Sequence, residues 1–247
     1  MEDKNLSFLT HFQELRLRVI ISLACVASAC AGMYFFSPSI LDNFIKPAGN
    51  LVFIHPGEAF WANVALAFWA GLAVSLPVIF FQIWKFISSA LRSSEKKYVL
   101  LFGVMSLLLF IGGGLLGYFL ILPISIKFLF AFGSDSLVPM ISVGNYIGFA
   151  GGLIFIFGSV FQLPLIIVFL TKISLIKPKT LSDRRREVVL VIFITAAFFT
   201  PPDVITQMLM AGPLLILYEV SIILSKLVVS PKGSADKERS NRVKDEN

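Results

Sequence analysis

The stretch FWANVALAFWAGLAVSLPVIFFQIW, residues 60–84, contains no charged side chain. A helix needs about 20 residues to cross the hydrocarbon core of a bilayer, so this run is long enough to span it with some tilt. Lys85 follows directly and opens a connection that also carries Arg92, Lys96 and Lys97. A long apolar run that stops at a basic cluster is typical of a transmembrane helix whose basic end stays in the cytoplasm.

Three further apolar runs have the length of a membrane span. They are residues 19–36, 98–123 and 145–171. A last apolar run, residues 204–225, is interrupted by Pro213 and Glu219. The whole chain is 57% hydrophobic, above the roughly 45–50% of soluble domains. The sequence therefore predicts an all-α integral membrane protein.

One more apolar run, residues 188–199, is too short for an ordinary span and ends at Thr200-Pro201-Pro202-Asp203. Its helix would cover about 18 Å of a hydrocarbon core of about 30 Å. It could form a re-entrant hairpin with the run that follows, or the two could be genuine short spans that locally thin the bilayer. We favour two short spans, because the prolines stop the helix and leave almost no loop. The capping-box spacing of Thr180–Asp183 predicts that this helix begins there.

The basic residues predict the orientation of the spans. All but Lys46 and Lys127 of the 21 Lys and Arg residues lie in four segments, and such residues near a span resist translocation. We expect six spans with both termini in the cytoplasm. The predicted cytoplasmic segments are residues 1–18, 85–97, 172–187 and 226–247, and the predicted outside segments are residues 37–59, 124–144 and 200–203.

The chain is predicted to contain one membrane domain, residues 1–229. The charged tail, residues 230–247, lacks apolar periodicity and is expected to be disordered. The net charge of +6 is explained by the cytoplasmic loops rather than by nucleic-acid binding, because no basic face is interleaved with aromatic residues. Pro77, Pro164 and Pro213 lie inside apolar runs and predict bent helices. Several bent helices packed together predict a concave, cup-like bundle.

Two acidic residues stand out on the predicted cytoplasmic face. Glu14 precedes Arg18 by four residues, so the two can pair on one helix face, and Arg16 lies between them. Glu95 stands beside Lys96 in an otherwise basic connection. These charges could be ordinary orientation signals and solvated loop residues. Alternatively, the two carboxylates could hold guanidinium groups, because a carboxylate accepts a planar two-point contact from Arg.

Polar side chains inside the apolar runs require partners, since unpaired polar groups are costly in a membrane. Gln162, Gln207 and Glu219 are such residues, and either helix–helix hydrogen bonds or a functional role would explain them. We find no catalytic motif, and His11 and His55 lie on opposite predicted sides of the membrane, so they cannot share a metal ion. We therefore expect no enzyme activity, no cofactor and no metal site.

The order and spacing of these residues resemble the TatC family, the receptor subunit of the twin-arginine protein translocase, from about Leu6 to Lys226. The residues that carry the resemblance are His11, Glu14-Leu15-Arg16, Arg18, Pro77, Gln82, Trp84, Phe86, Glu95-Lys96-Lys97, Phe161-Gln162, Pro164, Arg184–Arg186, Thr200–Asp203, Gln207, Pro213 and Glu219. This chain differs from the common family pattern at Gln162, where a glutamate is usual, and at Ser89, where a proline is usual.

The resemblance implies a bacterial inner-membrane protein that binds signal peptides bearing paired arginines. With the single-span partners TatA and TatB, and as a homo-oligomer within a receptor complex, it would export folded proteins using the proton-motive force. The implied roles are acceptors of the substrate arginines for Glu14 and Glu95, shaping of the same patch for Arg16, Phe86 and Lys96, contact with a partner helix for Thr200 and Gln207, and assembly through the outside loop for Pro47 and Phe60.

The rival interpretation is a secondary solute transporter. Such a protein would need a midplane site with ionisable groups or broken helices in matching halves of the chain. Glu219 is the one acid inside an apolar run, and the two halves do not match. We therefore favour the signal-peptide receptor.

Overall fold

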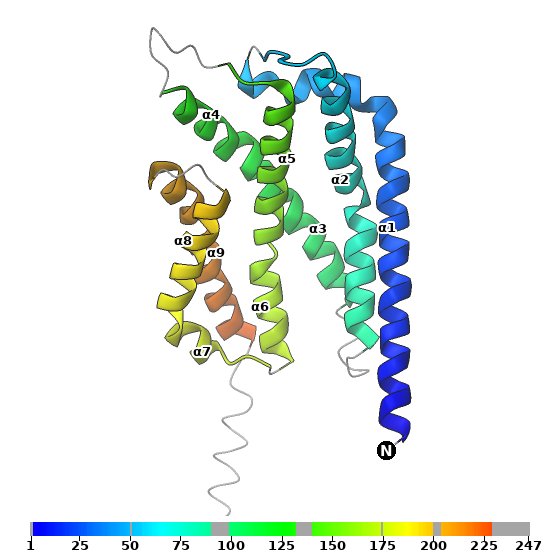
Figure 1. The fold of residues 1–247 in the computed structure, drawn as a ribbon. Coiled ribbons are helices and arrows are strands. Elements are labelled where there is room, and N and C mark those ends of the chain that lie inside the picture. The colour runs from blue at the N-terminus through cyan, green and yellow to red at the C-terminus, as the bar shows by residue number, and fades with distance from the viewer. Residues whose placement is uncertain are drawn as a thin grey trace, which may run out of the picture. The chain divides into compact units, whose positions relative to one another are not determined.

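The computed structural model describes residues 2–49, 51–89, 99–131, 140–173, 175–199 and 204–228 (Figure 1). Four of the predictions lie outside these residues, namely those for Glu95, Lys96, Thr200 and the tail 230–247. The regular elements of the described part are helices, joined by short connections, with one isolated parallel bridge between Val52 and Ser142. The expected all-α class is confirmed for this part of the chain.

Contacts divide the chain into two compact units, Met1–Phe161 and Gln162–Asn247. The first unit contains α1 (Glu2–Phe44), the 3-10 turn η1 (Lys46–Ala48), α2 (Glu58–Ser89), α3 (Val99–Leu116), the π-helical segment η3 (Gly117–Ile121), α4 (Leu122–Phe130) and α5 (Val143–Val160). The second unit contains α6 (Leu163–Lys172), α7 (Pro178–Asp183), α8 (Arg185–Phe199) and α9 (Val204–Val228).

Within the described residues, five helical segments are long and apolar enough to cross a membrane. They are His11–Ala48, Glu58–Ser89, Val99–Phe130, Val143–Lys172 and Met210–Leu227. These segments correspond to the four long predicted runs before residue 172 and to the last run. Helix α8 has 15 residues and covers about 22 Å, so it is short, as its run length predicts.

The third predicted span does not end near Pro123, which corrects the sequence prediction. The helical path continues through this proline to Phe130, and the π-helical segment η3 directly precedes it. In a regular α-helix, the ring of Pro123 would clash with the carbonyl of Phe119 one turn earlier. The wider π-helical turn relieves this clash, so the helix continues where the sequence predicts a stop.

The start of the short helix is also corrected. Thr180 is not an N-cap residue, because α7 begins at Pro178 and contains Thr180. Proline is well tolerated at the first helical position, since that position has no use for an amide donor. A break at Arg184 then separates α7 from α8. By contrast, the interruption predicted at Pro164 is present, because α5 ends at Val160 and α6 begins at Leu163.

Helices α1 and α2 form a long antiparallel pair, visible at the right of Figure 1. Hydrogen bonds at two levels give its register. The Ser37 hydroxyl donates to the Asn63 side-chain oxygen at 3.1 Å, and Arg18 donates to Gln82 at 3.2 Å. The step from Arg18 to Ser37 is 19 residues along α1 (37 − 18), and the step from Asn63 to Gln82 is also 19 along α2 (82 − 63). The two helices therefore keep one register over this whole length.

A glycine sets the closest approach of the two helices. A Cβ atom placed on Gly71 would lie 2.5 Å from the backbone nitrogen and Cα of Cys30. Backbone atoms cannot move aside as the tip of a side chain can, so this site accepts only glycine. Small residues at helix contacts are the usual means of close packing in membranes.

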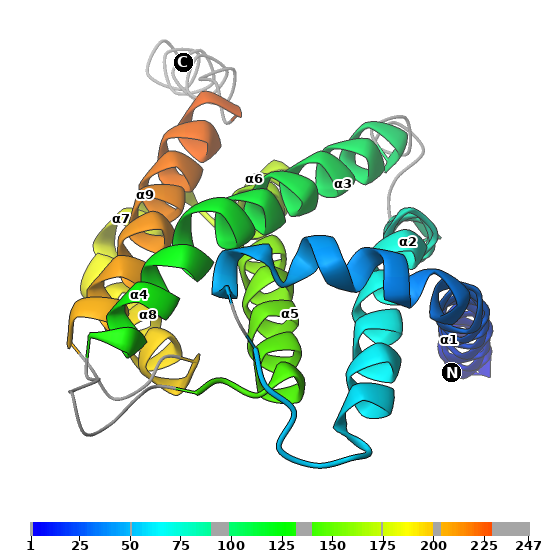
Figure 2. The same cartoon turned by 90° about the horizontal axis from the view of Figure 1, so that it is seen from above.

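The end of the first unit opposite the N-terminus is held by polar contacts. Helix α1 contains Pro38, and its last part turns to cross above α5 (Figure 2). There the Tyr146 hydroxyl donates to the Phe44 carbonyl at 2.8 Å. The Glu58 carboxylate accepts the backbone N–H groups of Ile54 at 2.8 Å and Gly144 at 3.0 Å. Glu58 thereby joins the α1–α2 connection to the start of α5.

In the second unit, α9 packs against α6, α7 and α8. Its buried residues Met210, Leu214, Tyr218 and Ile222 recur every four positions and form one face of the helix. The Tyr218 hydroxyl donates to the Leu181 carbonyl of α7 at 2.7 Å. One stripe of α9 thus forms the core of this unit.

Gly71→Ala is predicted to destabilise the protein, because the new methyl group would push the backbones of α1 and α2 apart. Overpacking of this kind costs about 1–3 kcal/mol. The measurement is the thermal unfolding midpoint of the purified protein in detergent. Gly112→Ala is the matched control, since a Cβ at Gly112 meets nothing within 4 Å. An equal effect of both variants would contradict the close contact at Gly71.

Candidate functional site

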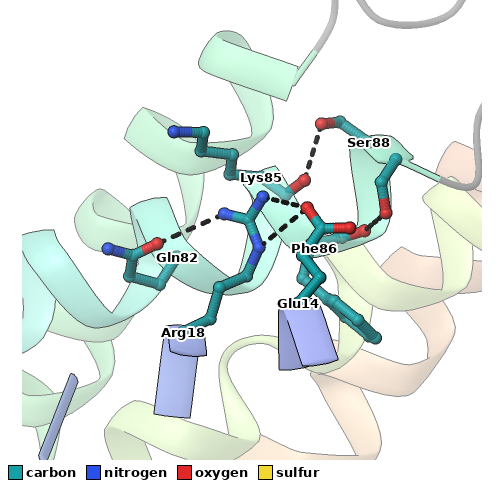
Figure 3. Close-up of polar contacts among 7 residues, drawn as sticks. Glu14, Arg18, Gln82, Lys85, Phe86 and Ser88 are labelled. Carbon is teal, nitrogen blue, oxygen red and sulfur yellow. Dashed lines mark hydrogen bonds and ion pairs between the residues drawn. The ribbon is translucent and has the colours of Figure 1, made fainter. Parts of the chain in front are cut away.

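The candidate site lies where the first half of α1 passes the last turns of α2, within the first unit. Helix α1 carries Glu14 and Arg18 one turn apart, and α2 carries Gln82 and Phe86 one turn apart. The antiparallel register places these two pairs opposite each other (Figure 3). Residues four positions apart lie on the same face of a helix, which explains each pair by itself. The contact between the two pairs depends on the packing of α1 against α2.

Arg18 joins the two helices through its guanidinium group. Its Nε donates to Glu14 Oε1 at 3.2 Å, and its Nη2 forms an ion pair with the same oxygen. Its Nη1 donates to Gln82 Oε1 at 3.2 Å. The side chain of Arg18 is only 12% exposed, whereas that of Glu14 is 32% exposed. The predicted pairing of Glu14 with Arg18 is confirmed.

An aromatic contact lies beside this ion pair. The rings of His11 and Phe86 stack, with centroids 4.4 Å apart and planes 20° from parallel. Phe86, a residue of the predicted patch, thus touches His11, which belongs to the same motif as Glu14 but was not predicted as a site residue. The half-buried ring of Phe86 forms part of the wall next to Glu14.

The last turn of α2 is closed by serine side chains. The hydroxyl of Ser88 donates to the Lys85 carbonyl and that of Ser89 to the Phe86 carbonyl, both at 2.7 Å. The Phe86 carbonyl is one of the last four of α2, which have no partner within the helix. The serine at position 89 therefore completes this helix terminus with a hydrogen bond.

The remaining residues of the predicted patch are not gathered at this contact. Arg16 is exposed, and no hydrogen bond or ion pair of its side chain is found among the described residues. Glu95 and Lys96 belong to the α2–α3 connection, outside the described part. Of the predicted signal-binding residues, the structure therefore brings together Glu14 and Phe86.

The predicted polar residues of the second unit take part in internal contacts. Gln207 donates from Nε2 to the Phe193 carbonyl at 3.0 Å, which links α9 to α8. Glu219 forms an ion pair with Arg185 at 2.8 Å, and both side chains are about half exposed. Gln162 is 9% exposed at the N-terminus of α6. Hydrogen bonding between helices, one of the two explanations left open, thus applies to Gln207.

The outside-loop residues lie at the other end of the first unit. Pro47 is half-buried in η1, and Phe60 is 54% exposed in the first turn of α2. Phe60 makes edge contacts with Tyr34 and Trp61. These two residues are therefore separate from the Glu14 contact.

Two residues with clear roles were not selected from the sequence. Gln82 was noted for its place in a motif but not as a partner of Arg18, because spacing along one helix does not reveal a contact between helices. Glu58 was not singled out, although its position before an apolar run is one where a carboxylate can accept backbone N–H groups. Among the described residues, no group of three or more His, Cys, Asp or Glu side chains could hold a metal ion.

Comparison with known proteins identifies similar chains. Residues 10–213 match the family model of the Sec-independent protein translocase protein TatC. The chain is 37% identical over 242 residues to the Sec-independent protein translocase protein TatC of Carboxydothermus hydrogenoformans, covering 96% of this chain and all of that one. It is 38% identical over 220 residues to the protein of the same description from Helicobacter pylori strain ATCC 700392 / 26695, covering 88% and 87%.

A solved structure is also similar. The crystal structure of a twin arginine translocase receptor, TatC, superposes with a TM-score of 0.80 at 34% sequence identity. The match covers 89% of this chain and 100% of that chain. The similarity thus extends over nearly the whole membrane part.

The stacking of His11 on Phe86 predicts efficient cross-linking between the two helices. In a variant whose native cysteines Cys25 and Cys30 are replaced by serine, His11→Cys with Phe86→Cys should form a disulfide on mild oxidation. The gel shift of a protein cleaved between α1 and α2 would report the bond. Arg16→Cys with Phe86→Cys is the control, because Arg16 points away from that face. Equal cross-linking of both pairs would contradict the described register.

Proposed function

The chain belongs to the TatC family of Sec-independent protein translocase proteins, and we propose that it is the signal-peptide receptor and core subunit of a twin-arginine translocase. The observation that supports this role most directly is the carboxylate of Glu14, held beside Phe86 at the meeting of α1 and α2. A fixed carboxylate next to an aromatic ring suits a guanidinium group. The guanidinium can donate planar hydrogen bonds to the carboxylate and stack on the ring.

The preference for arginine follows from hydrogen-bond geometry. A guanidinium carries five N–H donors in a rigid plane, whereas the ammonium of lysine is a compact point charge. In this proposal Glu14 binds one arginine of the signal, and Glu95 in the α2–α3 connection binds the second. Lys96 and Arg16 shape the surrounding patch. Two separate acids match two neighbouring arginines, which is why a paired motif is recognised.

The proposed topology has six spans with both termini in the cytoplasm of a bacterium and the protein in its inner membrane. The asymmetric distribution of Lys and Arg supports this orientation. Helices α8 and α9 would be the two final spans. Only α8, with 15 residues, is short, whereas α9 has 25 residues and is longer than the sequence interpretation of two short spans expects. The bilayer thinned beside α8 would lower the barrier for a transient opening. A concave face of the bundle would receive the apolar part of the signal.

Export of a folded protein requires partners. Six spans of this size cannot enclose a pore for a folded domain, so we propose a homo-oligomeric receptor complex that recruits TatA-like and TatB-like single-span proteins and uses the proton-motive force. Thr200 and Gln207 would contribute to a polar contact with a partner helix. Pro47 and Phe60 would act in assembly on the outside. Gln162 would contribute a hydrogen bond rather than a protonation step, because its side-chain amide does not ionise.

A solute transporter is not supported. The relatives are named as protein translocase subunits, and the chain has no matching halves around a midplane site. No observation favours enzymatic chemistry, since no nucleophile with an adjacent base was found in the sequence or among the described residues.

Glu14→Ala and Glu95→Ala are each predicted to weaken the capture of a signal peptide that bears paired arginines, because each removes one carboxylate acceptor. The expected loss is about tenfold or more, as for truncating one partner of a charged hydrogen bond. The measurement is photo-cross-linking of a labelled signal peptide to the protein in membrane vesicles. A peptide with paired lysines is the control and should bind weakly to every variant.

Membrane insertion of both variants, measured by carbonate extraction, should equal that of the parent protein. Normal capture by both variants, or equal capture of the arginine and lysine peptides by the parent, would refute the proposed receptor site.

Labelling of a single cysteine tests the two final spans. In a variant without native cysteines, Asp203→Cys should react with a membrane-impermeant maleimide added from outside, because the turn 200–203 faces outward in the six-span topology. Lys46→Cys is the positive control and Lys226→Cys the negative control. A re-entrant hairpin would leave Asp203→Cys unlabelled from outside, and this result would replace the six-span proposal.

A further inference from the structure

The acceptor group that the proposed function requires is already occupied. Glu14 Oε1 accepts two donors of a guanidinium, and Gln82 Oε1 accepts a third. We call these two side chains the guanidinium cradle. Its occupant in the structure is Arg18 of the same chain (Figure 3). A signal arginine can make this same set of contacts to Glu14 Oε1 and Gln82 Oε1 only when Arg18 leaves them.

The cradle is built from two helices rather than one. A pair at positions i and i+4 on an exposed helix is ordinarily worth little and needs no third partner. Here Gln82 comes from the opposite helix and binds the remaining face of the guanidinium. The side chain of Arg18 is 12% exposed, which is unusual for an arginine, whereas its neighbour Arg16 is exposed.

We infer that Arg18 is an internal stand-in for the signal peptide, and that a signal arginine binds by displacing it from Glu14 and Gln82. This inference rests on the proposed function and deepens it. It adds Gln82 as a contact for the signal arginine and assigns to Arg18 the role of a competitor. The released Arg18 has a long side chain, which can extend toward the lipid headgroups and keep its charge solvated there.

Displacement explains why lysine is a poor substitute. When one guanidinium replaces another, every hydrogen bond that is broken can be formed again. An ammonium cannot reproduce the planar set of donors that reaches both acceptors. A lysine that displaced Arg18 would leave Gln82 or part of Glu14 without a hydrogen-bond partner. The lost hydrogen bond lowers the affinity for a paired-lysine peptide. A ligand that displaces Arg18 must therefore replace its hydrogen bonds, and only another arginine can replace all of them.

Removal of Arg18 provides the test, because the two possible roles predict opposite signs. If Arg18 is a competitor, Arg18→Ala raises the affinity for the paired-arginine peptide. We expect about a two- to fivefold gain, the range of one partly exposed ion pair. If Arg18 only positions Glu14, the same change lowers the affinity. The measurement is the Kd of a fluorescent signal peptide for the purified full-length protein in detergent.

Lys85→Ala is the matched control for charge. Lys85 lies next to the cradle on α2, over the ring of Phe81, and its loss removes one positive charge without emptying the cradle. Gln82→Met tests the second acceptor, because methionine keeps the size of the side chain and lacks the amide oxygen. Because the change removes one hydrogen bond from the resident arginine and one from the incoming arginine, it should leave binding of the arginine peptide nearly unchanged and strengthen binding of the lysine peptide severalfold. The disulfide between His11→Cys and Phe86→Cys, formed in the Arg18→Ala background, checks that α1 and α2 remain in place.

The outcomes separate this inference from the proposed function. A gain for Arg18→Ala that exceeds the gain for Lys85→Ala, together with stronger binding of the lysine peptide by Gln82→Met, supports displacement. An unchanged or lower affinity of Arg18→Ala, a gain equal to that of Lys85→Ala, or unchanged or weaker binding of the lysine peptide by Gln82→Met overturns it. If Glu14→Ala still loses binding in that case, the receptor function stands without the displacement. Equal binding of arginine and lysine peptides by the parent protein would remove both.

Discussion

The antiparallel contact between α1 and α2 is the constraint on which the site depends. Gly71 lets the two backbones approach at Cys30, and the bonds from Ser37 to Asn63 and from Arg18 to Gln82 keep one register along the pair. A shift by one residue would rotate Gln82 by about 100° away from α1, since a helix has 3.6 residues per turn. The guanidinium cradle therefore depends on packing more than 15 Å away along the same two helices (about 11 residues at 1.5 Å each). The site is a property of the helix pair and not of either helix alone.

The sequence predicts features that depend on spacing within one helix. It does not predict contacts that depend on how two helices pack together. Run length and charge placement predict the long helices, and the four-residue spacing predicts the pair of Glu14 and Arg18, because these features are local. The contact of Arg18 with Gln82 requires the register of α1 against α2, which spacing within one helix cannot supply. The same limit explains Glu58, whose partners are Ile54 in the α1–α2 connection and Gly144 in the first turn of α5. Two predictions are wrong because the backbone has an alternative at those positions. A π-helical turn lets the helix continue through Pro123, and Pro178 rather than Thr180 begins the short helix α7.

Polar side chains have different kinds of partner in the two units, and this difference is relevant to function. In the second unit, Gln207 binds a backbone carbonyl of α8 and Glu219 binds Arg185. These contacts tie short helices together where the apolar core is small. In the first unit, Arg18 is held by the side chains of Glu14 and Gln82 at one end of the α1–α2 pair. A contact between side chains can be exchanged without breaking a backbone hydrogen bond, which is consistent with a recognition site for another guanidinium.

The most direct test of this account is to locate the bound signal arginine on the protein. A signal peptide with a photoreactive residue next to its second arginine would be cross-linked to the full-length chain, and the modified residues would be mapped by mass spectrometry. The account predicts cross-links to α1 near residues 14–18 and to α2 near residues 82–86. Cross-links confined to α8 and α9, with α1 and α2 unmodified, would contradict it.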